Sequence, residues 1–466
     1  MKRLILWFAV ILCVGSLSAQ TVTYTDADEW QAYDNFNRVF LDTRKYIYRD
    51  YSDRASAVDR WNGAAAIWCQ AIYYDMAVNA YRRALQENDA TRKAKYRAQA
   101  VRIYNGEKSQ YCDFDFDDNN TNTGWFVYDD IMWWTCALAR AYEVFGTTAY
   151  LTYSERSFCR VWYGSKKVGD DGSYADPARF EGKYAGGMFW EWQPIDNPKA
   201  HQPGDFRSAC INFPTVIAAC TLHQLVPDGR TEPTAAYPTR QTREWYLEKA
   251  REGYDWANTT LVSNGRVADG IHGGGPEWKD HLYNQATYIG ASCLLYKITG
   301  EARYLTNARR AADYVFTTMC SSYILPLETG VEQGIYCAIF AQYLHMLVYD
   351  CGQTRYLTYV KRNIQRGWDN RDATRGISNG KFNAATGSDE RVESYTGSGL
   401  PALMLLFPVG DSQTAVEPPA ARDKGATPQP VYGLDGRLLK AATLPSDVGN
   451  LHRGMYIYNR QKMLVR

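Results

Sequence analysis

The chain has 466 residues, and its 52 Lys and Arg almost balance its 51 Asp and Glu. Loss of an N-terminal leader carrying Lys2 and Arg3 would leave 50 basic and 51 acidic residues. Such a balance gives no electrostatic attraction to nucleic acid or anionic lipid, so neither is expected as a partner. The 36 Tyr and 14 Trp instead suit a neutral, hydroxyl-rich ligand such as a carbohydrate.

The first 19 residues are typical of a secretory signal peptide. Lys2 and Arg3 precede an apolar run from Leu4 to Gly15, and small residues follow before Gln20. The run is too short to span a bilayer, and no later segment is apolar for long enough to do so. We therefore expect an exported protein without an integral membrane segment, at the cell surface or in the medium, with the periplasm as the alternative.

Residues 20–410 alternate apolar-periodic runs with Gly-, Asp- and Asn-rich breaks, which indicates a helical domain. A loose repeat places Gly146, Gly300 and Gly352 just past helix ends, where a left-handed cap is needed, and a Tyr-Leu pair then starts the returning helix. The apolar spacing predicts twelve helices, at 27–51, 62–86, 91–107, 129–145, 148–165, 205–225, 242–260, 280–299, 301–319, 331–349, 353–369 and 392–407.

Loop lengths favour a closed arrangement of these helices. The turns inside hairpins are short, whereas the connections between hairpins are long and carry the unusual residues, at 108–128, 166–204, 261–279 and 370–391. Twelve helices make six hairpins, so the sequence predicts an all-α, (α/α)6 barrel with its long loops on one face.

The end of the chain differs in pattern. Residues 411–430 contain Pro-rich pairs and read as a linker. Residues 431–466 switch to a period of two, as in Met455–Tyr458 and Met463–Val465, with Asn459 and Arg460 as a turn. We expect a small C-terminal β domain there.

Asp129 and Asp130 are adjacent acids within a run of large aromatic residues that includes Trp125 and Tyr128. Burying two neighbouring carboxylates is costly, and paired carboxylates cleave glycosidic bonds while aromatic rings stack on sugars. The alternative is an ordinary helix start, with Asp129 as the N-cap and Asp130 as a first-turn acid. The density of Trp and Tyr favours the catalytic interpretation.

Adjacent residues diverge by about 100° on a regular helix, so the two acids can flank one bond only at a helix terminus. There Asp129 would keep loop geometry while Asp130 begins the first turn. The carboxyl groups could then lie about 5–5.5 Å apart, the separation of retaining glycosidases. The spacing alone does not assign the nucleophile and the acid/base.

Further candidates for sugar contacts lie in two later segments. Trp190 and Trp192 follow a Gly-Gly pair and could form a sugar-binding wall or plug the barrel rim, and Asn212 could contact sugar or serve a structural role. In the second segment the candidates are Asp269, Tyr283 and Asn284.

No metal or other cofactor is expected. His272 and His281 lack a third ligand at a recognisable spacing, and the sequence has no Gly-rich phosphate loop. Ten Cys remain once Cys13 leaves with the leader, and most fall in helices where Ala would serve, so we expect mostly free, buried thiols.

The chain resembles the glycoside hydrolase family 76 endo-α-1,6-mannanases over roughly residues 27–407. The resemblance rests on Tyr128–Trp134, Gly186–Trp190, Asp269-Gly270, Tyr283–Gln285 and the Leu-Tyr-x-x-Thr-Gly turn at Leu295. It implies an (α/α)6 barrel and retaining hydrolysis of α-1,6-mannan, with Asp129 as nucleophile and Asp130 as acid/base. The chain departs from the family pattern at Met188-Phe189 and Ile211–Phe213, where smaller residues are expected. The sugar subsites, and the choice between endo and exo action, therefore stay open.

Residues 431–466 resemble the C-terminal sorting domain of type IX secretion, on Val431–Arg437, Gly454–Ile457 and Lys462–Arg466. The alternative is a small accessory β unit. For the large domain, two other classes stay open: another (α/α)6 carbohydrate enzyme, such as a glucuronyl hydrolase or polysaccharide lyase, and a non-catalytic helical-repeat glycan-binding protein. We expect the protein to be a monomer.

Overall fold

The computed structural model describes residues 22–59, 64–116, 127–167, 169–190, 200–231, 233 and 239–411, and four C-terminal strands. The chain divides into two compact units. Unit 1 comprises Met1–Phe114, Tyr314–Gln342 and Arg355–Ser412, and unit 2 comprises Asp115–Asp313, Tyr343–Thr354 and Gln413–Arg466. The signal peptide and most of the proposed linker lie outside the described residues.

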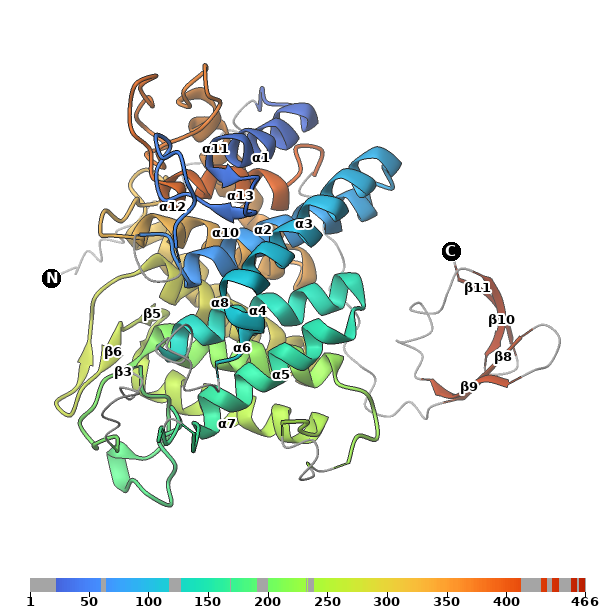
Figure 1. The fold of residues 1–466 in the computed structure, drawn as a ribbon. Helices are drawn as coiled ribbons and strands as arrows, with labels where there is room; N and C mark the ends of the chain where they lie inside the picture. Colours follow the sequence, from blue (N-terminus) through green and yellow to red (C-terminus); the bar gives the residue numbers. More distant parts are fainter. Residues whose placement is uncertain are drawn as a thin grey trace, which may run out of the picture. The chain divides into compact units, whose positions relative to one another are not determined.

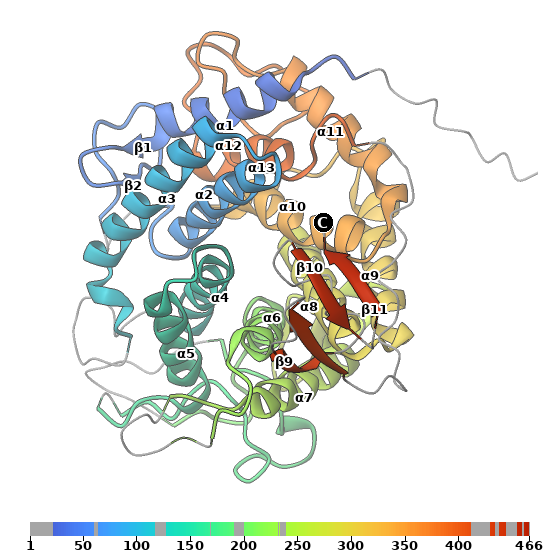
Figure 2. The same cartoon turned by 90° about the vertical axis from the view of Figure 1, so that its right-hand side faces the viewer.

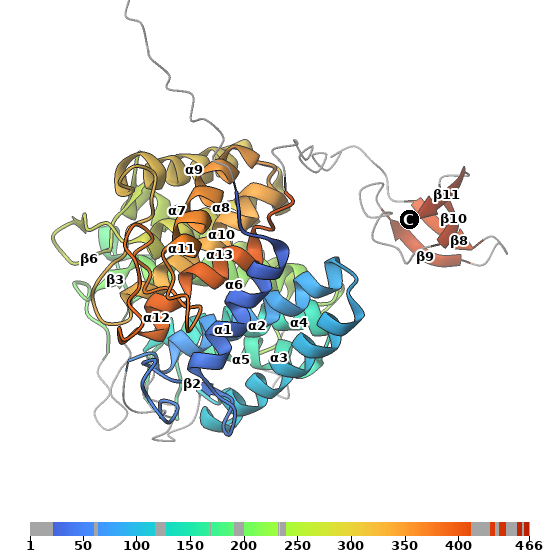
Figure 3. The same cartoon turned by 90° about the horizontal axis from the view of Figure 1, so that it is seen from above.

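Unit 1 is built from helices that bury aromatic residues. α1 packs against α13, and α2 packs against α3 and α13 (Figure 3). A capping box at Thr25 starts α1, and the Arg83 guanidinium bonds the buried Glu29 carboxylate of α1 at 2.7 Å. The helices are α1 (Asp26–Phe40), α2 (Trp68–Gln86), α3 (Ala90–Gln110), α11 (Leu357–Asp369), α12 (Ser394–Gly397) and α13 (Gly399–Leu406).

Short helical turns complete this unit. They are η1 (Cys112–Phe114), the π-helical η3 (Val315–Met319) that continues α9, and η4 (Gln333–Ile335), which contacts α12. α10 (Tyr336–His345) runs from unit 1 into unit 2, and η6 (Thr354–Tyr356) leads back to α11.

Unit 2 is a series of helical hairpins. α4 lies beside α5, α6 lies beside α7, and α6 also contacts α4 and α8 (Figures 1 and 2). Gly146 and Gly300 end α4 and α8 in the left-handed conformation, as the repeat predicts. The elements are α4 (Tyr128–Phe145), α5 (Thr148–Tyr163), α6 (Ala209–Leu225), α7 (Arg243–Leu261), α8 (Leu282–Thr299), α9 (Ala302–Tyr314), the 3-10 turn η2 (Gly182–Tyr184) and the π-helical η5 (Met346–Asp350).

Several expected helix starts or ends are wrong. α1 ends at Phe40 instead of 51, because the Asp42 side chain accepts from Arg44 N–H and a hairpin of β1 (Leu41–Asp42) and β2 (Ile47–Tyr48) follows. α2 begins at Trp68 instead of 62, since Ile67 has a φ of 52° that no helix allows. α6 begins at Ala209 instead of 205, because the two residues before it form a strand.

That strand is β3 (Arg207–Ser208), which pairs with β6 (Gly270–Ile271), and β6 in turn pairs with β7 (Pro276–Glu277). A second small pair joins β4 (Val262–Ser263) to β5 (Arg266–Val267). These short strands order the long connections that the sequence assigns to loops. Whether all the long loops gather on one face stays a prediction.

The C-terminal segment forms one antiparallel sheet in the order β11-β10-β8-β9, so its strands are confirmed. The strands are β8 (Gln429–Gly433), β9 (Leu438–Thr443), β10 (Gly454–Tyr458) and β11 (Gln461–Val465). The turn expected at Asn459 and Arg460 lies outside the described residues.

Two further expectations concern the chain as a whole. All ten cysteines after the leader are free thiols, and eight are buried, as predicted. Within the described part of the chain, no helix combines the length and the apolar character needed to cross a bilayer.

Candidate active site

The adjacent acids Asp129 and Asp130 lie in the first turn of α4. The helix begins at Tyr128, with Val127 as its N-cap, so both acids are helical. The expectation that Asp129 keeps loop geometry is therefore wrong by one residue. Both residues are half-buried, and the positive end of the helix dipole favours a negative charge there. The Oδ1 of Asp129 accepts from Asp130 N–H at 3.1 Å.

Hydrogen-bond donors surround the Asp129 carboxyl group. Its Oδ2 accepts from the thiol of Cys210 at a distance of 3.1 Å, and the Trp190 indole donates a further bond. Burial raises the pKa of Asp129 to about 6, and the bonds from Cys210, Trp190 and Asp130 limit that rise. Asp129 therefore ionises within the pH range in which a glycosidase acid pair works.

Cys210 reaches Asp129 because two elements fix the start of α6. The Ser208 hydroxyl caps the helix by accepting from Cys210 N–H at 3.1 Å. Ala209 N–H donates to the backbone carbonyl of Asp269 at 2.8 Å, next to the β3–β6 pairing. The first turn of α6 is thus tied both to its own cap and to the segment that carries Asp269.

The loop that carries Trp190 is held by Asn212 of α6. The fully buried Asn212 amide accepts from Met188 N–H at 2.9 Å, and it donates to the carbonyls of Met188 and Ser208 at 3.2 and 2.7 Å. Trp190 N–H donates to the Phe206 carbonyl at 2.9 Å. The amide of Asn212 is thus engaged by backbone, which favours the structural role that the sequence left open.

The Gly-Gly pair before Trp190 allows a close approach to α7. Gly186 and Gly187 have φ values of 81° and 77°, and a Cβ atom at either would lie within 2.6 Å of the Trp256 indole. Arg207 then bonds the Gly186 carbonyl at 2.8 Å. The two glycines therefore allow the loop to pack directly against the Trp256 ring.

Tyr128 is fully buried and points into a polar cluster. Its hydroxyl donates to Oδ1 of Asp170, while Arg160 forms an ion pair with Oδ2. His201 Nε2 lies 3.3 Å from the same hydroxyl. These contacts anchor the start of α4, and contact of Tyr128 with substrate stays a prediction.

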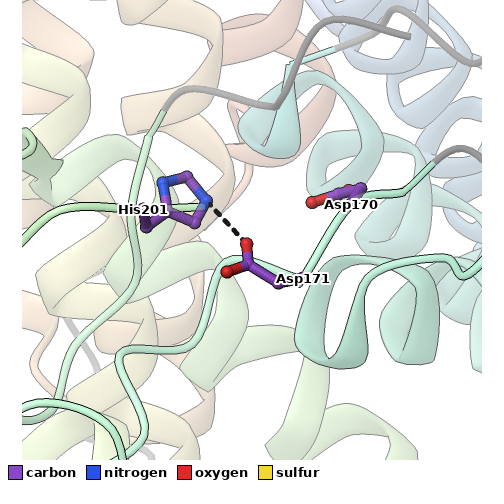
Figure 4. Close-up of side chains that lie close together, drawn as sticks. All are labelled: Asp170, Asp171 and His201. Atoms are coloured by element: carbon purple, nitrogen blue, oxygen red, sulfur yellow. Dashed lines mark ion pairs between the residues drawn. The ribbon is translucent and has the colours of Figure 1, made fainter. Parts of the chain in front are cut away.

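Asp170, Asp171 and His201 could offer a metal ion three ligand atoms, which all lie within 4.8 Å of one another. Figure 4 shows the His201 ring turned towards the Asp171 carboxylate, with Nε2 and Oδ1 3.7 Å apart. However, the Arg160 guanidinium already pairs with Asp170, and a cation would be repelled by it. The cluster is better explained as a buried ion-pair network.

Chelation should therefore leave activity unchanged. After dialysis against EDTA, the activity should equal that of untreated protein, because Asp170 is neutralised by Arg160 without an ion. Loss of activity that a divalent ion restores would contradict this expectation.

Asp269 also faces this part of unit 2. Its Oδ1 accepts from the Asn284 amide at 3.1 Å, and its Oδ2 lies 3.8 Å from His281 Nε2. Asp269 is partly exposed, Tyr283 is nearly buried and Asn284 is fully buried. Asn284 therefore orients Asp269, which is the member of this group that can meet a ligand.

The structure thus brings Asp129, Asp130, Trp190 and Asp269 together around the first turn of α6, whereas Trp125 and Trp192 lie outside the described residues. Cys210 is a further member of the site that is not among the residues predicted from the sequence. Cys210 follows Ser208 by two residues in the sequence. Ser is a common N-cap, so Ser208 could have indicated that a helix begins next to Cys210.

A helical unit with adjacent acids at a helix start, bordered by Trp190, is typical of glycosidases. The model of glycosyl hydrolase family 76 matches residues 34–398, and the chain belongs to this family. No curated protein matches the chain.

Solved structures match over most of their length. The α-1,6-mannanase from Salegentibacter sp. HEL1_6 is 20% identical, with a TM-score of 0.62 over 82% of this chain and 98% of that one. A family 76 mannosidase from Bacteroides thetaiotaomicron VPI-5482 is 17% identical, with a TM-score of 0.61 over 82% and 96%. Dfg5 from Chaetomium thermophilum, solved with glucosamine, is 11% identical, with a TM-score of 0.57 over 85% and 95%.

The same Salegentibacter enzyme was solved with α-1,6-mannotriose as an inactive variant in which two consecutive aspartates are changed to asparagine. At these identities the likeness shows the fold. The predicted fold class is confirmed, since the mostly helical chain with small sheets matches the helical toroid of family 76.

Proposed function

We propose that the protein is an endo-acting α-1,6-mannanase that hydrolyses its substrate with retention of configuration. The observation that carries the proposal is the pair of adjacent acids at the start of α4, with the Asp129 carboxylate held by three donors. It is supported by family membership and by the mannanase whose activity is lost when two consecutive aspartates are replaced.

We assign the nucleophile to Asp129 and the acid/base to Asp130. An indole N–H and a backbone N–H can only donate, so these contacts favour the charged form of Asp129 and oppose the burial that raises its pKa. A retaining enzyme needs one carboxylate charged and its neighbour protonated. Like charges so close resist joint ionisation, so the acid pair should titrate in two separate steps.

The substrate is tested by digesting linear α-1,6-mannan, branched α-mannan and a glucosamine-containing glycan, and sizing the products over time. An endo-mannanase gives a ladder of intermediate oligosaccharides from linear mannan. Release of mannose alone would contradict endo action, and cleavage restricted to the glucosamine-containing glycan would contradict the mannan assignment.

Retention of configuration is a separate expectation. In retaining glycosidases one carboxylate of the pair forms a covalent glycosyl-enzyme intermediate, and this intermediate preserves the anomer. Proton NMR of the first-formed product should show the α-anomer before mutarotation. A β-anomer at first would sink the role of Asp129 as nucleophile.

We further propose export through the signal peptide and delivery across the outer membrane through residues 431–466, whose four strands are compatible with a sorting domain. Mature protein starting at Gln20 and outside the cell is expected, and deletion of residues 431–466 should retain it in the periplasm. Unchanged delivery after the deletion would leave the segment as an accessory β unit.

A further inference from the structure

We propose that Cys210 is a positioning residue for Asp129, whose thiol donates a hydrogen bond that orients the carboxylate and lowers the cost of its charge. This inference rests on the proposed function, in which Asp129 attacks the sugar. The Sγ of Cys210 lies 3.1 Å from Oδ2 of Asp129, and Oδ1 is taken by Asp130 N–H. Both oxygens of the nucleophile therefore have a defined direction.

The direction of the bond follows from its neighbours. The ionised Asp129 can only accept, so the proton between the two groups belongs to sulfur. Sγ also lies 2.8 Å from the Ser208 hydroxyl, which in turn accepts from Cys210 N–H. Ser208 O–H then donates to Sγ, and Cys210 S–H donates to Asp129. The cap of α6 and the acid of α4 are joined through one thiol.

The ionisable groups around this pair keep the sulfur protonated. Burial raises the pKa of the Cys210 thiol well above its usual value, and the negative charges of Asp129 and Asp269 raise it further. Asp130 stands next to Asp129 on α4, and His281 faces Asp269 at 3.8 Å. Cys210 thus remains a donor over the range in which Asp129 titrates.

A thiol suits this position chemically. It is a weaker donor than a hydroxyl, so it can fix Oδ2 without withdrawing much of the negative charge that attack on the sugar requires. Ser208 caps the start of α6, and this cap fixes the position of the Cys210 sulfur. An alanine at position 210 would fit a buried helix equally well, but it could not donate a hydrogen bond to Asp129.

The test compares Cys210→Ala and Cys210→Ser with Cys220→Ala. Cys220 is a matched control, because it is a fully buried thiol on the same helix, twelve residues after the Ser208 cap. Loss of the donor destabilises the Asp129 carboxylate, so its pKa rises. The acid limb of the pH profile of kcat/KM should move to higher pH by about half to one unit in Cys210→Ala. At a fixed pH on that limb, kcat/KM should therefore fall by about three- to tenfold.

Cys210→Ser should keep the acid limb close to the wild-type position, since its hydroxyl can also donate. Cys220→Ala should leave the limb in place. A Cys210→Ala profile that superimposes on the wild type, or is lowered equally at every pH, would overturn the proposal, because a purely packing role does not move a titration.

A second readout does not depend on activity. The carboxyl resonance of ¹³C-labelled Asp129, identified by its absence from Asp129→Asn, can be titrated without substrate. We expect a wild-type midpoint near 6 and a higher one in Cys210→Ala. If mannan is not cleaved but the midpoint moves, the proposed function fails and the role of Cys210 stands. If the midpoint is unchanged in folded Cys210→Ala, the positioning role fails.

Discussion

Asp129→Asn should lower turnover by roughly four to six orders of magnitude on every α-mannoside, because no nucleophile remains to form the glycosyl-enzyme. The amide can still donate and accept hydrogen bonds, so the fold and sugar binding should survive. Both an activated aryl α-mannoside and linear α-1,6-mannan should be affected equally. The measurements are kcat on each substrate and the melting temperature of the variant.

Asp130→Ala is the matched comparison, one residue along the same helical turn. An acid is needed to protonate a poor leaving group but not an activated phenol, so this variant should lose mannan cleavage and keep glycosylation by the aryl substrate. The opposite pattern, with aryl activity kept in Asp129→Asn and lost in Asp130→Ala, would mean that the roles are reversed.

Asp170→Asn should destabilise the protein by about 3–5 kcal/mol, since removal of one partner leaves the buried Arg160 charge unpaired. The side chains of Arg160 and Asp170 are 1% and 0% exposed, so solvent cannot screen that charge. The substitution also removes a charged acceptor from the Tyr128 hydroxyl at the start of α4. Urea unfolding followed by far-UV circular dichroism gives the free energy of unfolding.

Asp171→Asn is the control for this experiment. It is the next residue, its side chain is 24% exposed, and it faces the exposed Arg179 and, at 3.7 Å, His201, so its loss should cost less than the loss of the Asp170–Arg160 pair. Equal unfolding midpoints for Asp170→Asn and the wild type would show that the Arg160 pair contributes nothing to stability.

Much of the helical framework was predictable from apolar spacing and glycine. Gly146 and Gly300 take the left-handed conformation at the predicted helix ends, because a residue with a Cβ is strained there. The alternation in Met455–Tyr458 likewise predicted β10. Local signals of this kind depend only on neighbouring residues, so a sequence carries them in full.

The arrangement of the site was less predictable, because it depends on which helices bring their N-terminal turns into contact. Tyr128 stands beside Asp129 in the sequence, but consecutive helical residues diverge by about 100°, so one enters the Asp170 cluster and the other faces α6. Asn212 and Cys210 lie two residues apart and serve the loop and the acid respectively. The sequence pattern of α6 does not show which of these two residues contacts the loop and which contacts the acid.

The thiols have a consequence for how the protein is made. Because none of Cys69 to Cys351 is engaged in a disulfide, the folded state of the described residues contains no bond that an oxidant must form. Folding of these residues therefore needs no disulfide isomerase.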